Sequence, residues 1–185
     1  MKLGTMDQNQ SLDRGKIISF LELLPDPIFS SQEAYNRFCR LAPEVWADVV
    51  GKQAPGEKFT KAFGDVQSAV EGSFKTSWGG VHVTKHVPPL VEKFLVVSQS
   101  RYLAFEKHEE KTETLVGADG IGLLVYRPEA SVELVSLLIC PGTEITLKPG
   151  QEHCLIALSD LLVFEKSTDP KGMDKDLIFI FEPAV

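Results

Sequence analysis

The chain has 185 residues, 43% hydrophobic residues and a formal net charge of −7, values typical of a soluble globular protein with one sizeable core. The negative charge, together with the lack of a basic stripe, argues against nucleic-acid binding. The longest apolar stretches are far shorter than the roughly 20 residues that a membrane-spanning helix needs, so no membrane span is expected.

Residues 1–12 are polar and are expected to form a disordered tail; they lack the apolar segment of a signal peptide. The three cysteines, Cys39, Cys140 and Cys154, show no CxxC spacing, and their odd number favours reduced thiols inside the cell. We therefore expect a cytoplasmic protein.

Helical patterns fill residues 13–72, which are expected to form an N-terminal helical extension packed on the rest of the chain. Asp13 can cap the first helix, and Ser30 or Ser31 can cap the second. The expected helices are Arg14–Leu24, Gln32–Leu41 and a separate short helix that starts at Pro43 and runs through Val50. The stretch 51–72 is mixed, and its residues expected to dock on the following domain are Phe59, Phe63 and Val66.

From residue 73 the pattern changes to β, and we expect one β-domain over 73–185. The expected strands are Val81–Val87, Val91–Gln99, Tyr102–Lys107, Ile121–Tyr126, Val132–Ile139, Glu144–Leu147, Cys154–Leu158, Leu161–Glu165 and Leu177–Phe181. Turn signals separate them, among them Gly117-Ala118-Asp119-Gly120 and Lys148-Pro149-Gly150. Many short strands at regular spacing predict an antiparallel sandwich or barrel.

Histidine and carboxylate side chains gather in two short segments of this strand series. Glu106 and His108 are two residues apart in an expected strand, so they point to the same face. Glu113 can return from the next strand across a short turn, and His153 would enter from a later hairpin. These four groups can converge on one divalent ion, for which Zn²⁺, Mn²⁺, Fe²⁺ and Ni²⁺ are suitable.

The two segments resemble the two motifs of the cupin superfamily, and they read Glu106-x-His108-x4-Glu113 and Pro149-Gly150-x-x-His153. The resemblance covers roughly residues 74–182. It implies a mainly β fold, the cupin-type double-stranded β-helix or jelly-roll barrel, with the helical extension in front of it. Glu106 stands where the cupin pattern has a histidine, and a carboxylate can replace an imidazole as a ligand.

One branch of the superfamily looks closer, because its pattern HxHxxKxE is similar to Glu106-x-His108-x-x-Lys111-x-Glu113. This branch holds type II mannose-6-phosphate isomerase domains and D-lyxose isomerases. The likeness implies a metal-dependent enzyme that isomerises a sugar or a related hydroxy-carbonyl compound. Lys111 would then contact a substrate oxygen; the alternative is a surface lysine that pairs with Glu109 or Glu113. The base that moves a proton between adjacent carbons would be Glu152, Glu110 or an unliganded Glu106.

Other functions fit the same segments. His108, Glu113 and His153 alone form a 2-His-1-carboxylate set, the ligand type of non-haem iron oxygenases. Some cupin lyases also combine preceding helices with such a site. A third alternative is a non-catalytic cupin that binds a small sugar or acid. Because cupin barrels commonly pair through their outer strands, the resemblance also implies a homodimer.

Further polar residues lie on neighbouring expected strands. His82 and His86 are four apart and could supply a ligand if Glu106 does not. Arg101 and Lys93 could bind an anionic group, although such residues are more often solvated. Cys154 follows His153 directly, so it faces the other side of its strand and is expected to be a buried apolar residue.

Overall fold

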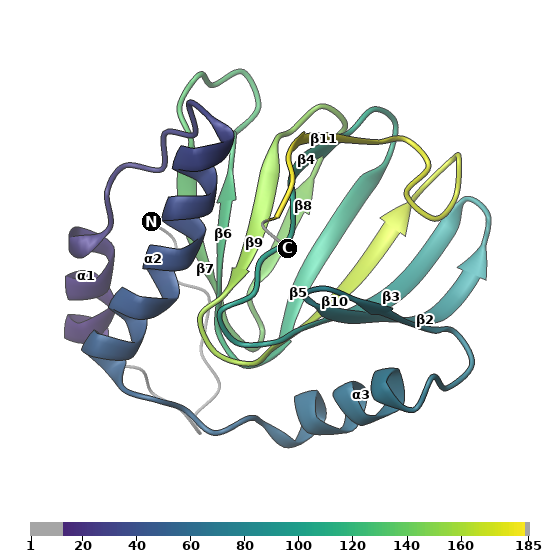
Figure 1. Ribbon diagram of the computed structural model, residues 1–185. Coiled ribbons are helices and arrows are strands. Elements are labelled where there is room, and N and C mark those ends of the chain that lie inside the picture. The colour runs from purple at the N-terminus through teal and green to yellow at the C-terminus, as the bar shows by residue number, and fades with distance from the viewer. Residues whose placement is uncertain (1–12, 184–185) are drawn as a thin grey trace.

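The computed structural model describes residues 13–183, so the expected disordered tail at 1–12 lies outside the described residues. Two β-sheets face each other, and helices cover both outer faces (Figure 1). Helices α1 (Arg14–Leu23) and α2 (Gln32–Val50) lie along one sheet, and α3 (Glu57–Gln67) lies beneath the other. No helix within residues 13–183 is long and apolar enough to cross a membrane.

The paired strands of both sheets are antiparallel. One sheet has the order β1-β2-β3-β10-β5-β8, with strands Ser73–Thr76 (β1), Gly79–Val87 (β2), Leu90–Val97 (β3), Leu161–Thr168 (β10), Thr112–Asp119 (β5) and Glu144–Leu147 (β8). The other has the order β11-β4-β9-β6-β7, with strands Leu177–Phe181 (β11), Phe105–His108 (β4), His153–Ala157 (β9), Gly122–Tyr126 (β6) and Val135–Ile139 (β7). This mainly β, two-sheet jelly roll with helices in front confirms the predicted fold class.

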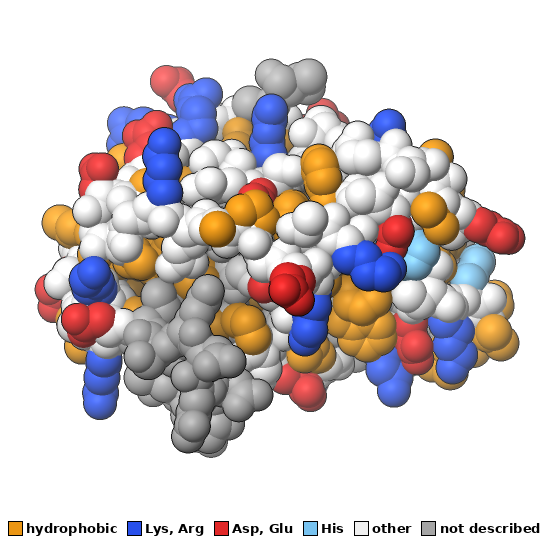
Figure 2. Space-filling model, turned by 90° about the horizontal axis from the view of Figure 1, so that it is seen from below, with side chains coloured by type: hydrophobic (Ala, Val, Ile, Leu, Met, Phe, Trp, Pro, Cys, Tyr) orange, Lys and Arg blue, Asp and Glu red, His pale blue; other side chains and the backbone are white. Residues whose placement is uncertain are grey.

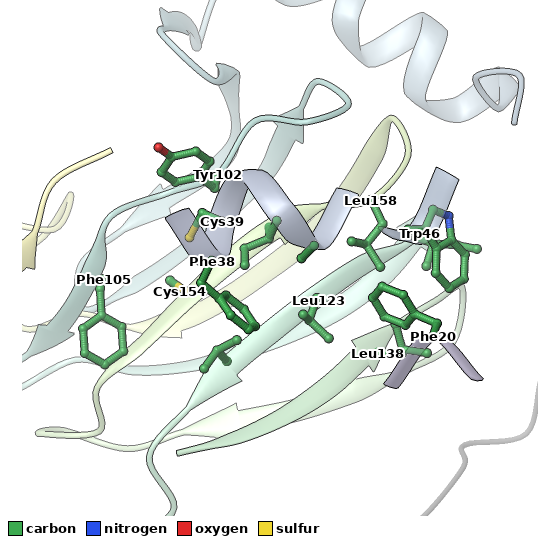
Figure 3. Packing of buried hydrophobic residues seen from close by; sticks show 14 of the residues in the cluster. Phe20, Phe38, Cys39, Trp46, Tyr102, Phe105, Leu123, Leu138, Cys154 and Leu158 are labelled. Carbon is green, nitrogen blue, oxygen red and sulfur yellow. The ribbon is translucent and has the colours of Figure 1, made fainter. Parts of the chain in front are cut away.

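Helices α1 and α2 bury their apolar faces on the five-stranded sheet (Figure 3). Phe38 of α2 packs near Leu123, and Phe20 of α1 packs near Leu138. The rings of Phe20 and Trp46 meet edge to face, with centroids 5.0 Å apart, a preferred geometry for aromatic pairs. The helical extension is thereby joined to the barrel through one continuous core.

One helix runs where two were expected. Helix α2 continues from Gln32 to Val50 with Pro43 inside it, so the prediction of a separate helix starting at Pro43 is wrong. A proline in a helix interior gives no N–H to the preceding turn and costs about 3 kcal/mol or more. The neighbouring side chains Ala42 and Trp46 are buried against the five-stranded sheet, and this packing overrides the local preference.

The stretch 51–72 contains α3, and the predicted docking of its apolar residues is confirmed. Phe59 and Val66 pack with Val96 and Leu162 on the outer face of the six-stranded sheet, and Phe63 adds to the same cluster. The six-stranded sheet therefore has its own helical cover, separate from the one over the five-stranded sheet.

The turn expected at residues 117–120 is wrong in its first part, because β5 continues through Asp119. Gly117 lies within this strand, where a Cβ atom would stand 2.1 Å from the carbonyl oxygen of Cys140. Its N–H donates to the carbonyl of Thr143 at 2.9 Å. Glycine is thus required here because two backbones approach closely. In the sequence, such a glycine cannot be distinguished from a glycine in a turn.

The face in Figure 2, which looks up at the molecule of Figure 1 from below, carries charges of both signs. Lys and Arg side chains are dispersed among Asp and Glu, and no continuous basic stripe is visible among the described residues of that face. This distribution agrees with the negative net charge of the chain.

We predict that Gly117→Ala lowers the free energy of unfolding by about 1–3 kcal/mol, because two backbones must separate to admit the methyl group. Gly64→Ala is a matched control, since Gly64 lies in α3 with no atom within 4 Å of an added Cβ. This control should raise stability by about 0.5–1 kcal/mol. Chemical denaturation measures both values, and equal effects of the two substitutions would contradict the close approach at Gly117.

Candidate metal centre

A cavity of about 230 Å³ lies between the two sheets and is lined by residues from both. Much of its wall is apolar, and Trp78, Leu95 and Leu155 belong to it. Its ionisable lining residues are Lys93, Glu106, His108, Lys111, Glu113, His153, Glu165 and Asp174. Four carboxylates, two ammonium groups and two imidazoles therefore share a small and otherwise apolar space.

Strand periodicity explains why β4 and β9 direct polar groups into this cavity. Glu106 and His108 alternate with Phe105 along β4 and line the cavity, whereas Phe105 packs with Tyr35 on the helix side. Glu106 lies directly opposite His153 in the pairing of β4 with β9. The carboxylate and the two imidazoles thus come from neighbouring positions of one sheet.

The ligand atoms of Glu106, His108 and His153 all lie within 4.8 Å of one another, so this cluster could hold a metal ion. Glu113, the fourth predicted ligand, approaches from β5 in the opposite sheet. One of its carboxylate oxygens lies 2.8 Å from His153 Nε2, and the other lies 3.9 Å from His108 Nε2. The structure brings all four residues together: ligand atoms of three lie within 4.8 Å of one another, and Glu113 lies beside them.

Both imidazoles are held through Nδ1 by an acceptor outside the cluster. His108 Nδ1 lies 2.9 Å from a carboxylate oxygen of Asp176, and His153 Nδ1 lies 3.0 Å from the carbonyl oxygen of Gln151. A carbonyl or ionised carboxylate oxygen only accepts, so each Nδ1 carries the hydrogen. Each Nε2 then faces the cavity, which is the orientation that metal-binding histidines commonly adopt.

Asp176 organises the turn between β4 and β5 as well as His108. Its second carboxylate oxygen accepts hydrogen bonds from the backbone N–H groups of Glu110 and Lys111, each at 2.8 Å. Burial alone would raise the pKa of Asp176, but these hydrogen bonds and the one from His108 lower it to about 2. The carboxylate therefore stays ionised at neutral pH.

Lys111 is buried at the centre of the carboxylates, with only 2% of its surface exposed. Its ammonium group lies 2.7 Å from oxygens of Glu113, Glu165 and Asp174 and 3.4 Å from His108 Nε2. Burial lowers the pKa of Lys111, but the three carboxylates more than offset this and hold it well above its usual value. Lys111 is thus a permanent cation beside the two imidazoles.

Burial and neighbouring charges also shift the pKa values of Glu106, His153 and Glu113. Burial raises the pKa of Glu106 to about 7, and the charge of His153 offsets only part of this effect. Burial lowers the pKa of His153, but the charge and hydrogen bond of Glu113 raise it to about 9. Burial also raises the pKa of Glu113, yet Lys111 and then His153 hold it well below its usual range. At neutral pH, His153 therefore carries a second proton that points toward Glu113.

Other residues singled out in the sequence are not brought to the cavity. Glu152 pairs with Arg127 at 2.8 Å and does not belong to the lining, because it alternates with His153 at the start of β9. Glu110 is exposed and pairs with Lys171 at 3.1 Å. His82 and His86 line a separate open groove around β2, where His82 contacts Ser73.

Four residues of this site were missed or undervalued by sequence reasoning. Lys93 and Glu165 pair at 3.2 Å across β3 and β10, and both occupy inward positions of their strands. A charged residue among alternating apolar ones was a signal that could have revealed them. Asp174 and Asp176 lie in the loop between β10 and β11, where no sequence period predicts which side chain turns inward.

No family model matches this sequence, and no curated protein matches it. Solved structures do show a similar fold. The capsular polysaccharide assembling protein CapF from Staphylococcus aureus matches with a TM-score of 0.52 and 12% identity, over 59% of this chain and 34% of that chain. The oxalate decarboxylase of Lactobacillus farciminis, in a formate complex, matches with a TM-score of 0.50 and 10% identity, over 58% of this chain and 33% of that chain.

This chain therefore spans about a third of the length of these two solved proteins. Structural matches at such low sequence identity indicate a shared fold and give no information about activity. Together with the order of the strands, the matches show that the chain has the cupin fold, a two-sheet jelly roll with three N-terminal helices.

Proposed function

We propose that Glu106, His108 and His153 hold a divalent metal ion and that the protein is a metal-dependent cupin enzyme. The observation that carries the proposal is the anchoring of both imidazoles through Nδ1, which leaves both Nε2 atoms facing the cavity, where ligand atoms of the three residues lie within 4.8 Å of one another. Histidines that pack for structure alone have no need of this common orientation.

The charges of the cavity favour the same conclusion. Without a metal ion, the proton on His153 offsets part of the excess of four carboxylates over two ammonium groups. Metal binding requires His153 to lose this proton, which would leave two negative charges in the cavity when Glu106 is ionised. Unbalanced charge is costly in a small space with apolar walls. A divalent cation would balance it, and mixed imidazole and carboxylate donors suit Zn²⁺, Mn²⁺, Fe²⁺ or Ni²⁺.

The proposed substrate is a small hydroxy-carbonyl compound, and the proposed reaction is the isomerisation of a sugar or a related molecule. A bound metal would polarise the substrate carbonyl as a Lewis acid. Lys111 would donate a hydrogen bond to a substrate oxygen, because its ammonium group lies beside the imidazoles. Glu152 is not proposed as the proton carrier, because its carboxylate does not line the cavity. Glu106 lines the cavity and has a pKa of about 7, so it would serve as the base if it does not bind the metal.

The size of the cavity and the spacing of its residues support this reaction. A volume of about 230 Å³ lies below the roughly 300–1,000 Å³ of sites for drug-sized ligands, so the substrate must be small. The spacing of Glu106, His108, Lys111 and Glu113 is similar to that of cupin sugar isomerases. Interconversion of aldoses and ketoses by protein loaded with manganese or zinc is the test, with metal-free protein as the control.

An iron-dependent oxygenase is a second candidate, favoured by one observation. Glu106, His108 and His153 form two-imidazole, one-carboxylate donors, the ligand type of non-haem iron oxygenases. Oxygen uptake by the iron-loaded protein in the presence of small hydroxy acids or sugars, without aldose turnover, would favour this candidate over the isomerase.

A homodimer and a cytoplasmic location also stay predictions of the sequence. Light scattering of the purified protein at several concentrations decides between one copy and two. Neither prediction affects the metal proposal, because all of the proposed ligands come from one chain.

We predict that His108→Ala and His153→Ala each weaken metal binding by roughly 100-fold or more, because each removes a ligand. Asp176→Asn should weaken it by roughly 10–100-fold, since it alters the acceptor that orients His108. Calorimetric titration with Mn²⁺ and Zn²⁺ measures these affinities. His86→Ala, which removes an exposed histidine outside the cavity, should leave them unchanged.

The variant Glu106→Gln tests whether this carboxylate is a metal ligand or lies beside a metal held by other residues. A loss comparable to that of the histidine variants identifies Glu106 as the third ligand, as we propose. Retained binding would instead leave the site to the histidines and Glu113. Equal affinity of the wild type, both histidine variants and His86→Ala would overturn the metal centre altogether.

Metal affinity is also predicted to rise with pH. Binding requires loss of the proton on His153 Nε2, whose pKa is about 9, and of any proton on Glu106, whose pKa is about 7. The apparent affinity should therefore increase as the pH rises through 7 toward 9, with proton release. Titrations in two buffers of different ionisation enthalpy measure the released protons, and an affinity that falls or stays constant over this range would contradict the assignment.

A further inference from the structure

Two lysines and two carboxylates form a closed ring at one side of the cavity. Glu165 places one oxygen 3.2 Å from Lys93 Nζ and the other 2.7 Å from Lys111 Nζ. Asp174 does the same from the other side, with one oxygen at 2.7 Å from Lys111 Nζ and the other in contact with Lys93 Nζ. Each carboxylate thus bridges both ammonium groups.

The two bridging carboxylates are held very differently. Glu165 lies on β10 with 3% of its side chain exposed, and its strand pairs with β3 on one side and β5 on the other. Asp174 lies on the loop between β10 and β11 with 28% of its side chain exposed. Glu165 is therefore a fixed part of the barrel, whereas Asp174 reaches the ring from a loop at the boundary with solvent.

The backbone of this loop is strained at the point where Asp174 enters. Met173 and Asp174 have φ angles of 53° and 59°, in the left-handed region that side-chain-bearing residues rarely adopt. The buried carboxylate of Asp169 holds the loop by accepting hydrogen bonds from Gly172 N at 2.7 Å and Asp174 N at 2.9 Å. Asp174 is therefore held at the ring by a loop in a sparsely populated backbone conformation.

We propose that Lys93 and Lys111 form a binding subsite for a substrate carboxylate, which the carboxylate of Asp174 occupies in this structure. Both ammonium groups line the cavity, and both side chains are nearly fully buried. A substrate carboxylate that displaces Asp174 brings the same charge and the same two oxygens, so the balance within the ring is preserved. The loop around Asp174 would move outward in exchange.

A carboxylate subsite restricts the substrate to small acids. The second contact of such a substrate, with the proposed metal ion, rests on the proposed function. Lys111 Nζ lies 3.4 Å from His108 Nε2, so a carboxylate on the lysines would place its neighbouring carbon beside the proposed metal ligands. The substrate then carries a carboxylate next to a hydroxyl or carbonyl oxygen, as small hydroxy and oxo acids do. A planar carboxylate matches the ring that Asp174 closes, whereas phosphate is larger and carries more charge.

The test uses the full chain with a chelator present, so that its outcome does not depend on the metal. Calorimetric titration with glycolate, a small hydroxy acid, should show binding to Asp174→Asn and Asp174→Ala at least tenfold tighter than to the wild type. The matched control is Asp65→Asn, which makes the same change at a carboxylate that is 31% exposed and pairs with Lys61 on α3. This control should bind glycolate no better than the wild type.

Further arms of the experiment identify the chemistry of the subsite. Glycolamide, the neutral analogue, should not bind to Asp174→Ala, and Lys93→Gln in that background should abolish glycolate binding. If this double variant does not fold, as judged by circular dichroism, glycolate-induced shifts of the lysine side-chain resonances in Asp174→Ala decide instead. Equal glycolate affinity in the wild type, Asp65→Asn and Asp174→Ala would overturn the subsite, and tighter binding of phosphate than of glycolate would overturn its assignment to carboxylates.

Discussion

Convergence of four carboxylates, two of them buried, on one small cavity is the constraint on which the rest of this structure depends. Carboxylates in an apolar space must be neutralised, because an unpaired buried charge is far more costly than an exposed one. Lys111 neutralises the largest share, since its ammonium group touches Glu113, Glu165 and Asp174 at once. Burial raises the pKa of Glu106 to about 7, because the charge of His153 offsets only part of the effect of burial.

This constraint divides the cavity into two halves with different chemistry. One half holds Glu106, His108 and His153, whose ligand atoms converge within 4.8 Å. The other holds the ring in which Glu165 and Asp174 bridge the ammonium groups of Lys93 and Lys111. A small molecule with a carboxylate at one end and a hydroxyl or carbonyl oxygen beside it fits both halves together. Glu113 touches both, because one of its oxygens faces His153 and the other faces Lys111.

Strand periodicity could predict much of this arrangement, and its failures have physical causes. The period of two selected Glu106 and His108 for one face, and the Pro-Gly turn indicated where His153 begins its strand. Lys93 was expected to bind an anionic group or to be solvated, and the structure instead pairs it with Glu165 on the inward faces of β3 and β10. Asp174 and Asp176 could not be predicted, because a loop without hydrogen-bond periodicity carries them inward. The prediction that a helix begins at Pro43 was wrong, because burial of α2 outweighs the local preference of proline for the start of a helix.

Anomalous X-ray scattering from a crystal soaked in Mn²⁺ tests the central claim most directly. We predict one strong peak inside the cavity, within about 2.0–2.3 Å of Nε2 of His108, Nε2 of His153 and a carboxylate oxygen of Glu106. A peak confined to carboxylates on the protein surface, or none in the cavity when the soak saturates other sites, would contradict it.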